Sequence, residues 1–273
     1  MIMMLQDKLM EYRKNKKAIL ATNFYNLETL TGILHAVKEV QAPVILQLSQ
    51  SSIEYMGLLM AVEMARRKIK EYEVEGWLHL DHGNNLSLIK RCLDAGFDSV
   101  MIDASEKSFS ENVEITSEVV ALAQKYGAHV EAELGYVAKL GQDQADNGFT
   151  QPEAAKKFVE MTGVHSLAVA IGSVHGFYVK SPNLRIDLLE RIYQATTCSL
   201  VLHGGSGIPA NMLQNAVLHG ISKINLATEI KDTFMRTLRL QLGQSSEIDL
   251  RKVFPVAIDA VSELIKDKLL LLG

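Results

Sequence analysis

Short apolar runs alternate with longer amphipathic segments along almost the whole chain. The runs span four to six residues, which is typical of buried strands, and the longer segments repeat apolar residues at helical spacing. The predicted strands are Ala18–Thr22, Pro43–Leu48, Glu75–Leu80, Asp98–Ile102, His129–Glu133, Ser166–Ile171, Ser199–Leu202 and Lys223–Leu226. The predicted helices are Leu27–Val40, Ile53–Tyr72, Leu86–Ala95, Phe109–Tyr126, Pro152–Thr162, Ile186–Ala195, Pro209–Leu218, Ile230–Leu242 and Val253–Leu271.

This alternation indicates a parallel sheet, because each helix carries the chain back to the start of the next strand. The pattern gives about eight strand–helix units, and no linker or low-complexity tract divides them. We therefore expect one α/β domain over residues 1–273, a single (β/α)8 TIM barrel with extra C-terminal helices. In that fold the catalytic side chains stand at the carboxyl ends of the strands.

Composition narrows the class of protein. The chain has 273 residues and is 48% hydrophobic, which is enough for a large core. A net charge of −4 and a pI near 6.1 argue against a nucleic-acid partner. No apolar run approaches the roughly 18 residues that cross a bilayer, so no membrane partner is expected. A polar start and only two cysteines, Cys92 and Cys198, favour a cytoplasmic location.

Three of the predicted strands are followed, within a few residues, by a histidine. The third strand runs directly into Asp81-His82-Gly83, and His175 and His203 follow the sixth and seventh strands. The carboxyl ends of barrel strands share one rim, so the three imidazoles are predicted to meet there. Imidazole is a preferred ligand of zinc, and three protein ligands with one open position form the catalytic arrangement. The alternative is that each histidine is a hydrogen-bonded core or loop residue.

Acidic residues end strands at the same rim. Asp81 could act as a general acid or base near a metal-bound oxygen, or it could orient a neighbouring group. Asp103 and Glu133 also end strands, and for them the prediction is that they orient the metal ligands. Glu131 lies two residues before Glu133 and is expected on the same face of its strand.

Glycine-rich turns follow the seventh and eighth strands. His203-Gly-Gly-Ser-Gly207 precedes one predicted helix, and Asn225-Leu-Ala-Thr228 precedes another. Glycine allows the backbone to approach a ligand closely, and N–H groups at the start of a helix bind anions. Barrels often bind phosphate at these two loops, which favours a phosphorylated ligand, although ordinary turns are the alternative.

Six motifs occur in order along the chain. They are Leu78–Gly83, Ser99–Ser105, Val130–Gly135, Leu167–Gly172 with His175-Gly176, Leu202–Gly207 and Lys223–Glu229. Together they closely resemble the class II, zinc-dependent ketose-bisphosphate aldolases, which include fructose-1,6-bisphosphate and tagatose-1,6-bisphosphate aldolases. The resemblance implies cleavage of a ketose 1,6-bisphosphate to dihydroxyacetone phosphate and glyceraldehyde 3-phosphate, and the reverse condensation.

The resemblance also implies roles for single residues. His82, His175 and His203 would bind one zinc ion per subunit, and Asp81 would transfer the proton of the C4 hydroxyl. The residues that would contact substrate or its phosphate are Gly176, Gly204, Gly205, Ser206, Asn225, Leu226, Ala227, Thr228, Asn23 and Ser49. Backbone carbonyls near Gly176 and Gly204 would hold Na+ or K+, as in some relatives. A homodimer or homotetramer is implied as well.

The loop after the fifth strand departs from the family. Relatives usually carry Gly-Gly-x-Glu-Asp there, and its glutamate exchanges a proton with the substrate. Here Tyr136–Thr150 contains no glutamate, and Asp143, Asp146 or a water could replace it. The length of the loop makes it a candidate lid. Two alternatives therefore stay open: another phosphorylated ketose, such as a monophosphate or a deoxy-keto-acid phosphate, or a non-catalytic aldolase subunit.

Overall fold

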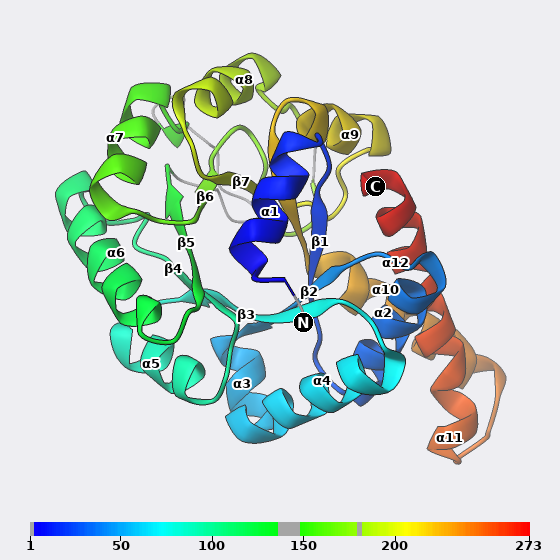
Figure 1. The fold of residues 1–273 in the computed structure, drawn as a ribbon. Coiled ribbons are helices and arrows are strands. Elements are labelled where there is room, and N and C mark those ends of the chain that lie inside the picture. Colours follow the sequence, from blue (N-terminus) through cyan, green and yellow to red (C-terminus); the bar gives the residue numbers. More distant parts are fainter. Residues whose placement is uncertain (1–2, 136–147, 179–181) are drawn as a thin grey trace.

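A closed barrel of eight parallel strands forms the centre of the computed structural model, which describes residues 3–135, 148–178 and 182–273. Helices surround the barrel (Figure 1). The strands are β1 Ile19–Asn23, β2 Val44–Ser49, β3 Gly76–Gly83, β4 Ser99–Ile102, β5 His129–Leu134, β6 Ser166–Val169, β7 Ser199–Leu202 and β8 Ile221–Leu226. The helices are α1 Leu5–Lys14, α2 Leu27–Val40, α3 Gln50–Met56, α4 Leu58–Tyr72, α5 Leu86–Asp94, α6 Phe109–Gln124, α7 Pro152–Thr162, α8 Ile186–Ala195, α9 Ala210–Leu218, α10 Thr228–Gln244, α11 Leu250–Val253 and α12 Pro255–Leu272.

The prediction of a (β/α)8 barrel with extra C-terminal helices is confirmed. β8 pairs with β1 and closes the sheet, and α2, α7, α8 and β7 have their predicted bounds. One predicted helix, Ile53–Tyr72, is divided in two, because Gly57, with a φ of 81°, separates α3 from α4. The predicted helix Val253–Leu271 corresponds to α12, which begins at a proline. The prediction does not include α1, whose ten residues are mostly polar, or the short helix α11.

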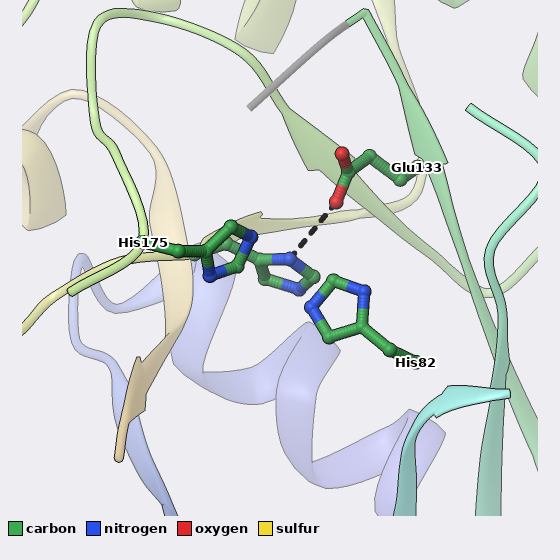
Figure 2. A group of neighbouring side chains, drawn as sticks. His82, Glu133 and His175 are labelled. Carbon is green, nitrogen blue, oxygen red and sulfur yellow. Dashed lines mark ion pairs between the residues drawn. The ribbon is translucent and has the colours of Figure 1, made fainter. Parts of the chain in front are cut away.

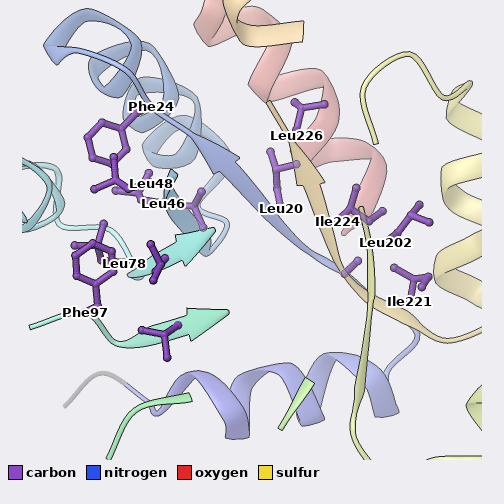
Figure 3. Close-up of a cluster of buried hydrophobic side chains, with 14 of the residues drawn as sticks. Leu20, Phe24, Leu46, Leu48, Leu78, Phe97, Leu202, Ile221, Ile224 and Leu226 are labelled. Carbon is purple, nitrogen blue, oxygen red and sulfur yellow. The ribbon is translucent and has the colours of Figure 1, made fainter. Parts of the chain in front are cut away.

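Alternate side chains of each strand face opposite sides of the sheet. One set, including Leu46, Leu48 and Leu78, packs against the surrounding helices and forms the main hydrophobic core (Figure 3). The other set faces the interior of the barrel. Near its carboxyl end that interior is polar, with buried residues such as Gln47 and Glu131. Hydrophobic burial outside the barrel thus stabilises the fold and leaves the interior free for polar side chains.

Helix α1 closes the amino-terminal end of the barrel, where Figure 1 shows it lying across the strands. Its Leu5 and Leu9 pack with Ile19, Ile45 and Trp77 in a second, smaller hydrophobic cluster. Any opening into the barrel interior is therefore expected at the other end, where the strands finish. Among the described residues, no helix is long and apolar enough to span a bilayer.

The contact between α2 and α12 depends on a glycine, which generates a prediction. A Cβ on Gly32 would lie 2.7 Å from the carbonyl oxygen of Ile258 and 3.0 Å from Val261. We expect Gly32→Ala to reduce the free energy of unfolding by about 1–3 kcal/mol, because the helices must separate to admit the methyl group. Gly243→Ala on α10 is the matched control, because its new methyl group would meet nothing within 4 Å. Equilibrium urea unfolding measures both, and a Gly32→Ala chain as stable as the parent would refute the close contact.

Candidate metal centre

The carboxyl end of β3 has an irregularity that turns two adjacent side chains toward one place. The pairing of β3 with β4 shifts register between Leu80 and Gly83, and His82 has a left-handed φ of 51°. In a regular strand, Asp81 and His82 would face opposite sides. The irregular backbone instead brings the His82 ring against the rings of His175 and His203. A left-handed conformation is costly for histidine, and such strain is characteristic of functional positions.

The structure brings the rings of His82, His175 and His203 together, as predicted. The ring centroid of His82 lies 5.1 Å from that of His175 and 4.8 Å from that of His203. Each ring, together with a carboxylate oxygen of Glu133, offers one ligand atom, and these four atoms lie within 4.8 Å of one another. Figure 2 shows the labelled side chains of His82, His175 and Glu133 pointing toward one another, and its dashed line from the Glu133 carboxylate marks the ion pair with His203. Glu133, expected only to orient a ligand, therefore stands among the possible ligands.

Carboxylates surround the imidazoles and attract positive charge. Burial alone would lower the pKa of His203, but Glu131 and Glu133 on either side of the ring raise it to about 10. The Asp103 carboxylate lies 2.7 Å from Nδ1 of His82. Burial, and the neighbouring rings of His203 and His82, lower the pKa of His175 to about 3, so its imidazole is neutral and keeps a lone pair. The negative charge around the rings and the lone pair of His175 therefore suit a cation held by nitrogen and oxygen ligands.

The donor set fits zinc. Three imidazoles and one carboxylate belong to the usual zinc ligands. Nδ1 of His203 and Oε2 of Glu133 lie 2.9 Å apart and are buried, yet neither has a hydrogen bond within the described residues. Two unsatisfied buried atoms that face each other at this distance are well placed to share a metal ion. The contact between Asp103 and His82 is the kind that fixes a metal-binding ring in place.

Asp81 is held beside this cluster by three amide side chains. Its carboxylate accepts from Asn23 Nδ2 at 2.9 Å, from Gln47 Nε2 at 3.2 Å and from Asn225 Nδ2 at 3.4 Å. Burial would raise the pKa of Asp81, but the imidazoles of His82 and His203 and the hydrogen bond from Asn23 lower it. The carboxylate is therefore ionised and can accept a proton.

The amide oxygens of Asn23, Gln47 and Asn225 are buried and have no partner among the described residues. Their nitrogens must face the negative carboxylate, so these oxygens remain as acceptors for hydroxyl groups of a ligand. The predicted substrate contacts Asn23 and Asn225 thus lie beside Asp81 at the mouth of the barrel, the end where the strands finish. Gln47 lies there as well, because it faces the barrel interior near the end of β2.

The two loops that carry His175 and His203 lie in close contact. Gly204 has a φ of 69°, and a Cβ there would lie 2.1 Å from the carbonyl oxygen of Val174. Tyr178 joins the loops, since its hydroxyl donates to the Gly204 carbonyl and accepts from the Val174 amide, both at 3.0 Å. Gly176 also has a positive φ, of 95°. No side chain other than hydrogen fits at Gly204 unless the two loops separate.

The remaining predicted residues lie at the same end of the barrel. Ser206 is buried, and its Oγ accepts from the Glu229 amide near the start of α10. Leu226 packs into the outer core, so only its backbone faces the mouth. The other members are Gly205, which is buried, Ala227 and Thr228, which are half-buried at the start of α10, and Ser49, whose hydroxyl caps α3 and contacts Ser51 and Ser52. The candidate lid Tyr136–Thr150 lies mostly outside the described residues, as do Asp143 and Asp146.

Alanine substitution of two glycines can separate the effect of backbone strain at a positive φ from the effect of the contact between the two loops. Gly163 has a φ of 66° with open space around its Cα, whereas Gly204 has nearly the same φ and no space. We expect alanine at either position to cost roughly 1–2 kcal/mol of stability through the backbone. Only Gly204→Ala should also weaken zinc binding, by tenfold or more, measured by chelator competition on the purified chain. Equal zinc affinity in both variants would show that the contact does not position the histidines.

Comparisons with known proteins agree with this geometry. The family model described as class II fructose-bisphosphate aldolase matches residues 4–273. The chain is 39% identical over 271 residues to the fructose-bisphosphate aldolase of Staphylococcus epidermidis, covering 97% of this chain and 95% of that protein. The identity is also 39% with the enzyme of that name from Geobacillus stearothermophilus, over 97% and 94% of the two chains. The crystal structure of the YdjI aldolase from Escherichia coli K12 superposes with a TM-score of 0.89 at 32% identity, covering 98% of this chain and 96% of that one. Since the family match runs from residue 4 to the last residue, the chain belongs to the class II fructose-bisphosphate aldolases, a family of enzymes.

Proposed function

We propose that this chain catalyses the zinc-dependent retro-aldol cleavage of a ketose 1,6-bisphosphate, fructose or tagatose, and the reverse condensation. The products would be dihydroxyacetone phosphate and glyceraldehyde 3-phosphate. One observation carries the proposal: the ionised carboxylate of Asp81 is held next to a cluster of three imidazoles and a carboxylate. A base beside a metal centre is what deprotonation of a substrate hydroxyl requires. The membership of the chain in the aldolase family supports this reaction over others that use the same groups.

His82, His175 and His203, with Glu133, would hold the zinc ion. Bound zinc supplies Lewis-acid polarisation of the ketose carbonyl. Asp81 would accept the proton of the C4 hydroxyl as the C3–C4 bond breaks and would return it in the condensation direction. The amides of Asn23 and Gln47 keep the Asp81 carboxylate in one orientation, so little reorganisation is needed when the proton moves.

The glycine-rich loops would bind the phosphate of the dihydroxyacetone phosphate part. Gly204, Gly205 and Ser206 follow β7, and Ala227 and Thr228 lie at the start of α10. N–H groups at such positions attract anions, and anchoring the phosphate holds the reacting carbons near Asp81. A Na+ or K+ ion beside Gly176 and Gly204, assembly into a homodimer or homotetramer, and a cytoplasmic location belong to the same proposal.

Substitution of the proposed base tests the assignment of roles. We expect Asp81→Ala to lower the cleavage rate by roughly 10²–10⁴-fold, because no other group in the proposed mechanism accepts the C4 proton. Its zinc content should equal that of the parent, since Asp81 is not in the proposed ligand set. Asp94→Ala, which removes an exposed carboxylate on α5, is the control and should leave the rate unchanged. A rate for Asp81→Ala within a few-fold of the parent would remove this residue from the mechanism.

Metal removal and a substrate panel test the reaction itself. We expect chelation to abolish cleavage, added zinc to restore it, and borohydride in the presence of substrate to leave the chain unlabelled. The panel should contain both bisphosphates, a ketose monophosphate and a deoxy-keto-acid phosphate, and the preferred substrate should be a bisphosphate. Higher activity on another phosphoketose would change the substrate and keep the mechanism. A purified, zinc-loaded chain that cleaves none of them would favour the non-catalytic subunit.

A further inference from the structure

A lysine lies buried inside the barrel below the metal cluster. Lys223 on β8 is only 1% exposed, and its Nζ donates to Oε2 of Glu131 at 2.7 Å and lies 3.4 Å from Nε2 of His79. Glu131 is fully buried as well. Burying two charged groups costs several kcal/mol per ion before their attraction offsets it, and an apolar pair of similar volume is often as stable. The proposed reaction uses neither residue directly, so the placement of this pair calls for a separate reason.

Glu131 connects the lysine to a candidate metal ligand. Its Oε2 accepts from Lys223, and its Oε1 lies 2.9 Å from Nε2 of His203. The ring of His203 donates its Nε2 hydrogen to this carboxylate, so Nδ1 is the nitrogen that can give up its own hydrogen and offer a lone pair to a metal. Nδ1 is the nitrogen that lies 2.9 Å from Glu133, on the side of the cluster. The contact on one side of the ring thus decides which nitrogen is available on the other.

We propose that the Lys223–Glu131 pair is a positioning device for the zinc site, which holds His203 with Nδ1 toward the metal. The inference rests on the zinc site of the proposed function. Lys223 fixes the carboxylate of Glu131, and Glu131 fixes both the tautomer and the direction of the ring. Because Lys223 lies on β8, Glu131 on β5 and His203 directly after β7, these contacts also link three strands below the metal. A carboxylate that accepts from a metal-binding histidine strengthens metal binding, and its loss typically costs 10- to 100-fold in affinity.

Three variants separate this role from a purely structural ion pair. Lys223→Met removes the anchor of Glu131, and Glu131→Gln keeps an oxygen acceptor for His203 but loses the ion pair. The double variant Lys223→Met with Glu131→Gln removes both charges together, so no unpaired charge remains buried. Lys8→Met is the matched control, because it makes the same substitution in an ion pair with Glu75 at 3.3 Å, on α1 at the closed end of the barrel.

Zinc affinity, measured on metal-free protein by competition with a chromophoric chelator, is the deciding quantity. We expect 10- to 100-fold weaker binding in both single variants and in the double variant, and binding within twofold of the parent in Lys8→Met. Where a single variant does not fold, the double variant decides. A folded double variant with an affinity within threefold of the parent would overturn the inference and leave the zinc site intact. A parent chain that binds no zinc would overturn the zinc site itself.

The parent protein provides a test that depends on no variant. In a sample with 15N-labelled histidine, the His203 ring should keep hydrogen on Nε2 in both the metal-free and the zinc-bound forms. On addition of zinc, the resonance of Nδ1 should shift to the position of a metal-bound nitrogen. If the Nε2 resonance shifts instead, Glu131 does not orient the ring and the inference is wrong.

Discussion

Two carboxylates hold a single buried imidazole from opposite sides, and the rest of the site is arranged around this contact. Glu131 and Glu133, two residues apart on β5, lie 2.9 Å from the two ring nitrogens of His203. So much negative charge in the interior of a protein is stable only beside positive charge. Lys223 supplies one charge below the ring, and the open side of the ring faces two more imidazoles, where a divalent cation would supply the rest.

The barrel makes this concentration of polar groups possible. Its hydrophobic core lies mainly outside the sheet, between strands and helices, so the interior near the carboxyl ends contributes little to hydrophobic stabilisation. Helix α1 closes the other end with apolar side chains such as Leu5 and Leu9. Polar residues therefore collect at one end, and each strand adds a side chain whose direction is fixed by rigid neighbours. The same rigidity holds Asp81 between amides from β1, β2 and β8.

The sequence pattern predicts most of this fold, since strands and helices of a barrel follow from local periodicity. The three histidines could be predicted as a cluster because parallel strands share one rim. Other features depend on what lies opposite in space. The irregular end of β3, which turns His82 toward the cluster, has no sequence signal except Gly83, whose Cβ would lie 2.6 Å from the Met101 carbonyl oxygen.

Three side chains of the site have roles that depend on partners from other strands or loops, and these partners cannot be predicted from the local pattern. Gln47 lies between two leucines on β2, and Lys223 alternates with Ile224 and Leu226 on β8, so their face of the strand could be predicted. Their partners Asp81 and Glu131 belong to other strands. Tyr178 follows the motif His175-Gly176, and its contact with Gly204 depends on how two loops cross. Helix α1 has only a weak periodic signal, because it is a short polar helix with two leucines packed against the barrel.

The central claim is that imidazoles from β3, from the loop after β6 and from the end of β7 converge on one zinc ion. The most direct measurement is anomalous X-ray scattering at the zinc absorption edge, on crystals of the chain prepared with one equivalent of zinc. We predict one strong peak per chain, bonded to His82, His175 and His203. A peak elsewhere, or none with zinc present in the crystal, would contradict the account.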